Sequence, residues 1–347
     1  MFNRLLGRFS QDIGIDLGTS NTLVYVKDKG IVINEPSVVA INSRNNQIIS
    51  IGEEARQMVG KTPAHLIISR PLVGGVISDF EVTEKMIRHF INKIHQEGLS
   101  FAPRPRVVIG IPLNITEVER KAVEDATRAA GAREVYLVEQ PLAAAIGARI
   151  PIQEPAGFML VDIGGGKTEV AVMSLGGVVT YNSLNIAGNE FDESIIQYAR
   201  ENFNLLLGQK TAEDIKIKIA TVTLENDRQE TAMRGRDLIT GLPREVMVSS
   251  VQIREAIIRS IRQIVEAIRD TLEKTPPELV ADIYQRGLLL SGGGAHLKGL
   301  DKLISQETRI PVQLIDDPQT AVVRGTGIIL EDLENLREVL LPSTAGE

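Results

Sequence analysis

Two stretches with the same pattern decide the fold: IGIDLGTSNTLVYV at residues 13–26 and MLVDIGGGKTEVAV at residues 159–172. Each runs from apolar residues through one aspartate, Asp16 or Asp162, into a turn of small residues and a second apolar run. This arrangement predicts a β-hairpin in each place. Small residues at a hairpin tip let backbone N–H groups approach phosphate oxygens, and an aspartate at the strand end suits hydrated Mg²⁺. The repeat therefore predicts two tips that hold one polyphosphate from both sides.

The composition is that of an ordinary globular protein. The 347 residues are 43% hydrophobic and 24% charged, which is enough for two domains that each have a core. No apolar run reaches the roughly 18 residues of a membrane span and no secretory signal follows the N-terminus, so we expect a cytoplasmic protein. With no cysteine and four scattered histidines, the chain excludes thiol catalysis and zinc–thiolate sites and leaves Mg²⁺ as the expected metal. The net charge of −7 argues against nucleic acid as a partner.

Predicted strands and helices alternate in two rounds. The strands of the first round are expected at 13–26, 31–33, 38–41, 48–51, 106–111 and 134–138. Its helices are one that runs from the capping box of Thr116 and Glu119 to Gly131, and an Ala-rich one at 141–148. After a linker at 151–155 the second round begins with the second hairpin, followed by helices within 191–223 and a hairpin at 230–248. A long helix at 251–274 then ends at two prolines, and a strand at 287–290 and a last helix near Thr320 complete the round. We therefore expect a duplicated α/β unit, with two domains around a cleft.

A third glycine-rich segment, SGGGAHLKGL at residues 291–300, follows a predicted buried strand and precedes a helix expected from Ala295. Glycines there would let a flat base or a phosphate lie against the backbone. A P-loop is an alternative interpretation of Gly166, Lys167 and Thr168. It is disfavoured because Val161 stands where the P-loop needs its first glycine, and because a strand follows where a P-loop needs a helix.

Five motifs, in this order and spacing, carry a resemblance to a known superfamily: DLGTSNT, EQPLAAAIGA, DIGGGKTEVAV, LSGGGAHLKGL and DPQTAVVRGTG. They resemble the phosphate 1, connect 1, phosphate 2, adenosine and connect 2 motifs of the actin/Hsp70/sugar-kinase ATPases, and the match to the bacterial MreB family is closer still. AGNEFDESI, GQKTAEDIKIKIA and RGRDLITGLPREV are similar to second-domain segments of that family.

The resemblance implies an α/β, actin-like fold in which duplicated ribonuclease H-like domains surround a nucleotide cleft. It also implies four subdomains: IA at 1–32, 66–145 and 312–347, IB at 33–65, IIA at 146–181 and 246–311, and IIB at 182–245.

Carried over by motif, the resemblance assigns the nucleotide site. The expected phosphate contacts are Gly18, Thr19, Ser20 and Asn21 at the first tip and Gly164, Gly165, Gly166 and Lys167 at the second. Asp16 and Asp162 would hold Mg²⁺ through water, and Asp162, Gln140 and Glu139 are the catalytic candidates. The remaining nucleotide contacts would be Gly188, Glu213 and Lys216, and on the adenosine side Gly292, Gly293, Gly294 and Ala295.

Two positions depart from the family pattern. Gln140 stands where relatives usually carry glutamate; glutamine cannot act as a general base but can orient water, so slow hydrolysis is expected. Lys167 replaces the usual threonine, and it would either neutralise γ-phosphate charge or project into solvent. Taken without the family, Glu213 and Lys216 have an alternative interpretation as an exposed ion pair at helical spacing.

Two apolar segments predict contact with a membrane. Phe2, Leu5, Leu6 and Phe9 share one face of a short basic helix, which would lie in a lipid interface or else pack on the domain or stay disordered. Leu99 and Phe101 lie in a Gly/Pro loop at the place where MreB relatives carry a membrane-inserting loop.

The resemblance implies a cytoskeletal protein that binds ATP (or GTP) with Mg²⁺, hydrolyses it slowly and polymerises. Its filaments would be antiparallel protofilament pairs on the inner face of the plasma membrane, where they determine cell shape by organising peptidoglycan synthesis with RodZ-like and MreC/MreD-like partners. Two alternatives remain: a structural filament that binds nucleotide with little or no turnover, and a small-molecule kinase of the same fold.

Overall fold

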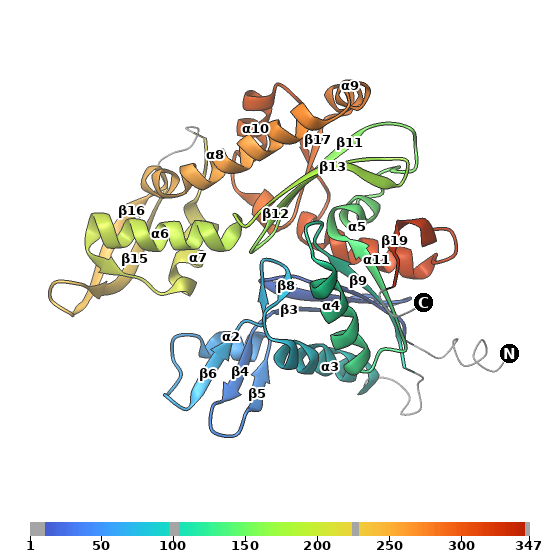
Figure 1. Ribbon diagram of the computed structural model, residues 1–347. Coiled ribbons are helices and arrows are strands. Elements are labelled where there is room, and N and C mark those ends of the chain that lie inside the picture. Colours follow the sequence, from blue (N-terminus) through green and yellow to red (C-terminus); the bar gives the residue numbers. More distant parts are fainter. Residues whose placement is uncertain (1–10, 97–103, 224–228, 344–347) are drawn as a thin grey trace. The chain divides into compact units, whose positions relative to one another are not determined.

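The computed structural model describes residues 11–96, 104–223 and 229–343 (Figure 1). The chain forms two compact units. The first consists of Met1–Pro155, Ser174–Val178 and Gln319–Glu347, and the second of Ala156–Met173 and Val179–Pro318.

A six-stranded sheet forms the centre of the first unit, in the order β19-β10-β9-β1-β2-β3. Its strands are β1 (Ile13–Leu17), β2 (Asn21–Val26), β3 (Gly30–Pro36), β9 (Arg106–Ile111), β10 (Glu134–Glu139) and β19 (Leu340–Leu341). Strands β1 and β2 pair as the predicted antiparallel hairpin, while β1, β9 and β10 run parallel. Every residue of β1 is buried, as expected for a central strand covered on both faces. Asp16 is therefore held near the end of a rigid strand.

Helices and a small sheet complete the first unit. The small sheet, in the order β5-β4-β6, contains β4 (Val39–Asn42), β5 (Gln47–Ile51) and β6 (Leu66–Ser69), and a short hairpin contains β7 (Leu72–Val73) and β8 (Val76–Ile77). The helices are α2 (Glu53–Met58), α3 (Phe80–Gln96), α4 (Glu117–Ala129), α5 (Gln140–Gly147), α11 (Ala321–Glu331) and the 3₁₀ turn η4 (Arg337–Val339). Helix α4 begins with the predicted capping box, in which the Glu119 N–H donates to the Thr116 hydroxyl and the Thr116 N–H donates to the Glu119 carboxylate.

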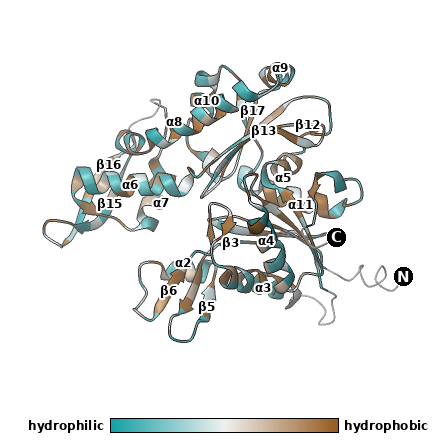
Figure 2. Cartoon of the chain, in the orientation of Figure 1, coloured by the Kyte–Doolittle hydropathy of each residue, from teal (hydrophilic) through white to brown (hydrophobic). Residues whose placement is uncertain are grey.

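Helices α5 and α11 are largely apolar (Figure 2) and their backbones touch. A Cβ at Gly325 would lie 1.8 Å from the Ala143 carbonyl oxygen, and one at Gly147 would lie 2.0 Å from the Ala321 carbonyl oxygen. Only glycine allows an approach this close. Helix α11 also packs on β1 and β9, so it covers the strand that carries Asp16.

The central sheet of the second unit repeats the strand order of the first, as β13-β12-β11-β17-β18. Its strands are β11 (Phe158–Ile163), β12 (Thr168–Ser174), β13 (Gly177–Leu184), β17 (Leu288–Ser291) and β18 (Val312–Leu314). Here β11 and β12 form the second predicted hairpin, and β17 and β18 run parallel to β11 as β9 and β10 do to β1. The matching order confirms the duplicated α/β unit that the two aspartate motifs predict.

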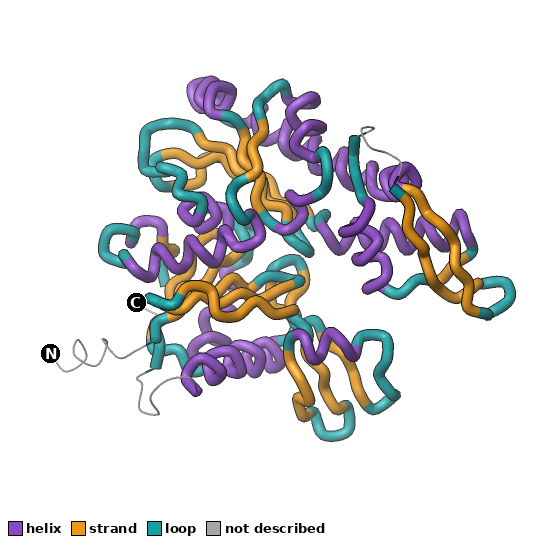
Figure 3. Tube along the Cα trace, turned by 180° about the vertical axis from the view of Figure 1, so that it is seen from behind, coloured by secondary structure: helices purple, strands orange, loops and turns teal. Residues whose placement is uncertain are grey.

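The second unit carries its own insertion after the third strand. It contains α6 (Gly188–Phe203), α7 (Gln209–Ile219), and a sheet of β14 (Leu205–Leu206), β15 (Glu230–Asp237) and β16 (Pro243–Ser249), whose long hairpin stands out in Figure 3. The unit is completed by α8 (Ser250–Lys274), α9 (Pro277–Arg286), η2 (Gly293–His296), α10 (Leu300–Thr308) and η3 (Pro318–Thr320), the last of which ends beyond the unit.

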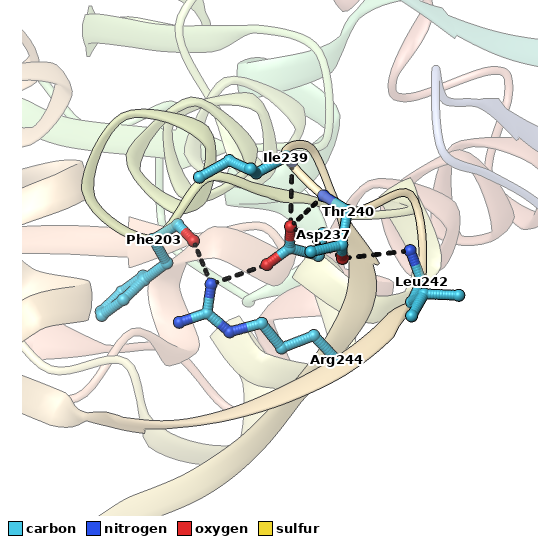
Figure 4. A network of polar contacts seen from close by, with 6 residues as sticks. All are labelled: Phe203, Asp237, Ile239, Thr240, Leu242 and Arg244. Carbon is cyan, nitrogen blue, oxygen red and sulfur yellow. Dashed lines mark hydrogen bonds and ion pairs between the residues drawn. The ribbon is translucent and has the colours of Figure 1, made fainter.

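The β15–β16 turn is held by one buried aspartate (Figure 4). Asp237 accepts hydrogen bonds from the backbone N–H groups of Ile239 and Thr240, at 2.9 and 2.8 Å, and from the guanidinium of Arg244 at 2.9 Å. The Thr240 N–H and then Arg244 hold the pKa of Asp237 down, at about 2. Asp237 is therefore ionised at physiological pH and can accept all of these bonds.

The structure corrects three sequence expectations. No α-helix begins at Ala295, because Gly292, with φ of 83°, leads only into the short 3₁₀ turn η2, and α10 starts at Leu300. The prolines at 276 and 277 end α8 but also begin α9, since proline fits the first turn of a helix. Residues 312–318, expected with subdomain IA, lie in the second unit because β18 pairs with β17, and residues 146–155, expected with IIA, lie in the first.

Candidate functional site

The first hairpin tip joins β1 to β2 and is fastened through its carbonyl groups. The Ser37 hydroxyl donates to the Gly18 carbonyl oxygen at 2.6 Å, and the Ser37 N–H donates to the Ser20 carbonyl oxygen at 2.9 Å. A Cβ at Gly18 would lie 2.6 Å from the Asn21 carbonyl oxygen, so this tight turn requires glycine. The tip is thus a fixed backbone loop directly after Asp16.

Two side chains of this tip already have protein partners. The Thr19 hydroxyl accepts a hydrogen bond from the Gly75 N–H at 2.8 Å, and the Asn21 amide donates to the Asn34 side chain at 3.0 Å. A phosphate contact from either side chain would have to share or exchange these bonds. The backbone of the tip is the better candidate for holding a phosphate.

Asp16 and Gln140 lie together in the first unit. The Gln140 amide nitrogen donates to Oδ1 of Asp16 at 3.2 Å. Gly110 on β9 makes room for this contact, because a Cβ there would lie 3.3 Å from Cγ of Gln140. Glu139, the last residue of β10, is partly buried, and burial raises the pKa of its carboxyl group. Of the two catalytic candidates from the connect 1 motif, Gln140 is the one bonded to Asp16.

The second hairpin tip is closed by its own backbone and held by α6. The Gly164 N–H donates to the Lys167 carbonyl oxygen at 3.0 Å, while the N–H groups of Gly188 and Asn189 donate to the carbonyl oxygens of Gly164 and Gly165 at 3.2 and 2.7 Å. This contact brings the predicted residues Gly164, Gly165 and Gly188 together. Thr168 then begins β12, so the strand that argued against a P-loop is present.

Asp162 is buried at the end of β11, and among the described residues its Oδ1 has no hydrogen-bond partner. Burial raises the pKa of its carboxyl group to about 6, against the opposing effect of a hydrogen bond from the Ser291 hydroxyl. Gly292 lies directly against it, since a Cβ there would be 2.9 Å from this Oδ1 and 2.3 Å from the Ile163 carbonyl oxygen. The adenosine motif and the second aspartate therefore share one site.

The four residues Gly292–Ala295 have different roles in the structure. A Cβ at Gly294 would lie 2.3 Å from the Ile163 side chain, so this glycine, like Gly292, is needed for packing on β11. A Cβ at Gly293 would meet nothing described within 4 Å, and Gly293 is exposed, whereas Ala295 is buried in the core. Gly293 is thus the residue of this turn that a flat ligand could approach.

The Asp162 carboxylate suits a Mg²⁺ ion that has few protein ligands. An orphaned, buried carboxylate oxygen on Asp162 is a hard ligand of the kind that Mg²⁺ prefers. In the described parts of the chain, no three His, Cys, Asp or Glu side chains gather as a metal cage. Mg²⁺ commonly uses one or two carboxylates together with water and substrate phosphates, and Asp162 fits that use.

Lys216 is bound to helix α6 within the second unit. Its ammonium forms an ion pair with Oδ1 of Asp192 at 2.8 Å and donates to the Gly188 carbonyl oxygen at 2.8 Å. The alternative of an exposed Glu213–Lys216 pair is therefore wrong for Lys216, whose side chain is only 16% exposed. The sequence pattern missed Asp192, because nothing local links it to a lysine on the next helix.

The predicted membrane residues Phe2, Leu5, Leu6, Phe9, Leu99 and Phe101 lie outside the described residues. Within the described ranges, none of the helices has the length and apolar character needed to span a bilayer.

Comparison with known proteins places this geometry in a family. The family model described as MreB/Mbl protein matches residues 10–338. The chain is 50% identical over 328 residues to the cell shape-determining protein Mbl of Bacillus subtilis, covering 94% of this chain and 98% of that protein. It is 48% identical over 338 residues to the cell shape-determining protein MreB of Escherichia coli, covering 96% and 97% of the two chains.

Solved structures agree with the sequence comparison. MreB5 of Spiroplasma citri bound to ADP superposes with a TM-score of 0.89 at 36% identity, over 94% of this chain and 98% of that one. The same protein bound to AMPPNP gives the same TM-score. The MamK double helical filament, at 23% identity and a TM-score of 0.77, shares the actin-like fold. With two units of the same strand order, a glycine-rich tip after a buried aspartate in each, and these relatives over nearly its whole length, the chain belongs to the MreB/Mbl family of actin-like proteins.

Proposed function

We propose that this protein binds ATP with Mg²⁺, hydrolyses it slowly and assembles into filaments that shape the cell. The observation that supports it best is the orphaned Asp162 oxygen beside Gly292, directly before the glycine tip that α6 holds. A buried carboxylate oxygen without a partner is costly unless a ligand completes its contacts. The related MreB5 structures contain ADP and AMPPNP, which favours an adenine nucleotide over GTP as the ligand here.

The proposed roles follow from these contacts. Backbone N–H groups of the tips at 18–21 and 164–167 would bind the phosphates, and Asp16 and Asp162 would hold Mg²⁺, which neutralises phosphate charge when bound. Lys167 is available to add positive charge to the second tip. Gly188, Glu213, Lys216 and the residues from Gly292 to Ala295 would contact the nucleoside, with Gly293 as the open surface.

Slow hydrolysis is supported by the contact between Gln140 and Asp16. Because the amide nitrogen donates to Asp16, the amide oxygen of Gln140 is the atom that would accept a hydrogen bond from an attacking water. Such an arrangement orients water but removes no proton. Asp162, and Glu139 with its raised pKa, are the carboxylates that could take that proton.

The alternative is a filament that binds nucleotide with little or no turnover, and the same Gln140 contact favours it. Phosphate release from purified protein with ATP and Mg²⁺ separates the two functions. We expect release above the buffer background that disappears in Asp162→Ala, whereas a wild-type rate equal to background together with normal ATP binding would refute the ATPase. The exposed Asp270 on α8 supplies the matched control, because Asp270→Ala should keep the wild-type rate.

Assembly and membrane binding are proposed on family membership. The filaments would be antiparallel protofilament pairs on the inner face of the plasma membrane, with RodZ-like and MreC/MreD-like partners in peptidoglycan synthesis, and the protomer would have subdomains IA, IB, IIA and IIB. Electron microscopy with ATP and anionic liposomes tests this. Filaments on the liposomes, reduced by Leu99→Ser/Phe101→Ser or by removal of residues 1–9, are expected; an absence of filaments with every nucleotide would instead favour a small-molecule kinase.

A further inference from the structure

One buried ion pair in the second unit connects two helices to the phosphate tip. Asp192 lies in the first turns of α6 with its side chain 4% exposed, and Lys216 lies on α7. The lysine ammonium contacts both the Asp192 carboxylate and the Gly188 carbonyl oxygen. Because removing two charges from water offsets much of their attraction, a pair this buried adds little net stability. Its main effect is to fix the positions of the groups that it joins.

The same first turn of α6 determines which way the phosphate tip faces. The N–H groups of Gly188 and Asn189 bind the carbonyl oxygens of Gly164 and Gly165. The chain has no cis peptide among its described residues, and in a trans peptide the C=O and the following N–H point in opposite directions. The N–H groups of Gly165 and Gly166 must therefore point away from α6. These are the donors that a phosphate group would use.

We propose that Asp192 is a positioning residue for polyphosphate binding. It holds Lys216 against the Gly188 carbonyl oxygen, which fixes the start of α6 and so aims the N–H groups of the tip at 164–167. This inference rests on the proposed nucleotide-binding function and adds to it a residue that does not itself touch the nucleotide. Burial raises the pKa of Asp192 to about 6 even though Lys216 opposes the shift, which agrees with a carboxylate kept in place at an energetic cost.

A comparison of ADP with AMP tests the proposal, because AMP lacks the phosphates that the tip would bind. Dissociation constants for both nucleotides with Mg²⁺ are measured by isothermal titration calorimetry, well below the unfolding temperature. We expect Asp192→Asn to weaken ADP binding about tenfold more than it weakens AMP binding, which lowers the preference for ADP. Any lost contact between Lys216 and the nucleoside affects both nucleotides alike and cancels in this ratio. Asp192→Glu keeps the charge on a longer side chain, and its preference should lie between those of the wild type and Asp192→Asn.

Asp237→Asn is the matched control, because Asp237 is also a buried aspartate paired with a cation in the second unit, but in the β15–β16 turn (Figure 4). It should keep the wild-type preference for ADP. Equal loss of ADP and AMP binding in Asp192→Asn, or the same fall in Asp237→Asn, would overturn the positioning role while leaving the proposed function intact. If Asp192→Asn does not fold, an unchanged preference in Asp192→Glu overturns it. A wild type that binds neither nucleotide would overturn the proposed function as well.

Discussion

Replacing Asp162 by asparagine should make the metal-free protein more stable at neutral pH. The carboxyl group has its pKa raised from the ordinary 3.8 to about 6 by burial, so the folded protein resists its ionisation. Well below the ordinary pKa of 3.8 both states are protonated and the group costs nothing. As pH rises, the unfolded chain ionises first, and the free energy of unfolding falls until the folded carboxyl group ionises as well.

The size of the effect follows from the shift. A difference of about 2 pKa units corresponds to about 3 kcal/mol above pH 7, and about half of that at pH 5. Asparagine has nearly the same shape but does not ionise, so Asp162→Asn removes this cost. The variant should therefore exceed the wild type in free energy of unfolding by up to about 3 kcal/mol at pH 7.5 and by less at pH 5.

Urea denaturation followed by circular dichroism, in EDTA at both pH values, measures this difference. The exposed aspartate control, Asp270→Asn, should match the wild type at each pH. A stability gain that does not depend on pH, or an Asp162→Asn protein less stable than the wild type at pH 7.5, would refute the explanation from burial. The same variant should lose the extra thermal stabilisation that Mg²⁺ adds to ADP, since a ligand stabilises only the state that binds it.

Four further substitutions have clear expected outcomes. Gly292→Ala should lower the free energy of unfolding by at least about 2 kcal/mol, because φ is 83° and a Cβ would lie 2.3 Å from the Ile163 carbonyl oxygen. Gly293→Ala should instead fold normally and weaken ADP binding about tenfold. Calorimetric unfolding and titration distinguish the two variants, and equal effects would contradict the different roles of these glycines. Asp12→Asn should cost about 2–3 kcal/mol in urea unfolding, because Asp12 is buried against the Arg106 guanidinium at 2.6 Å; an unchanged midpoint would show that the pair contributes nothing. Gln140→Glu should raise the rate of phosphate release several-fold by supplying a general base, and a rate at or below that of the wild type would exclude the proposed water-orienting position.

Local signals predicted most of the fold. The two aspartate hairpins, the capping box of α4 and the long helix α8 depend on residues close together in the sequence, and the structure confirms them. Helix α9 was missed because two adjacent prolines end one helix and begin the next. The strand β18 was placed in the wrong unit because sheet pairing is not a local property.

The site was harder to predict than the fold. The motif predicted that the three glycines at 292–294 belong to the site. It could not show that, of these three, Gly293 is the one with space beside it for a ligand, since this depends on how Ile163 packs. Asp192 was missed because its partner Lys216 comes from another helix. The sequence suggested Gln140 as a candidate, but its contact with Asp16 depends on two strands and a helix start meeting in space.

The arrangement of helix α11 has a consequence for how the protein is made. This helix packs on β1, β9 and α5, and β19 pairs with β10, yet both elements come from the last part of the chain. The second unit is almost continuous, at 156–173 and 179–318, and can be completed earlier. At a synthesis rate of 5–20 residues per second, roughly 190 residues must follow β10 before α11 has emerged, a wait of about 10–40 s. The first domain to be translated is therefore the last to close its core, and the part of its sheet that α11 will cover stays exposed on the ribosome until then.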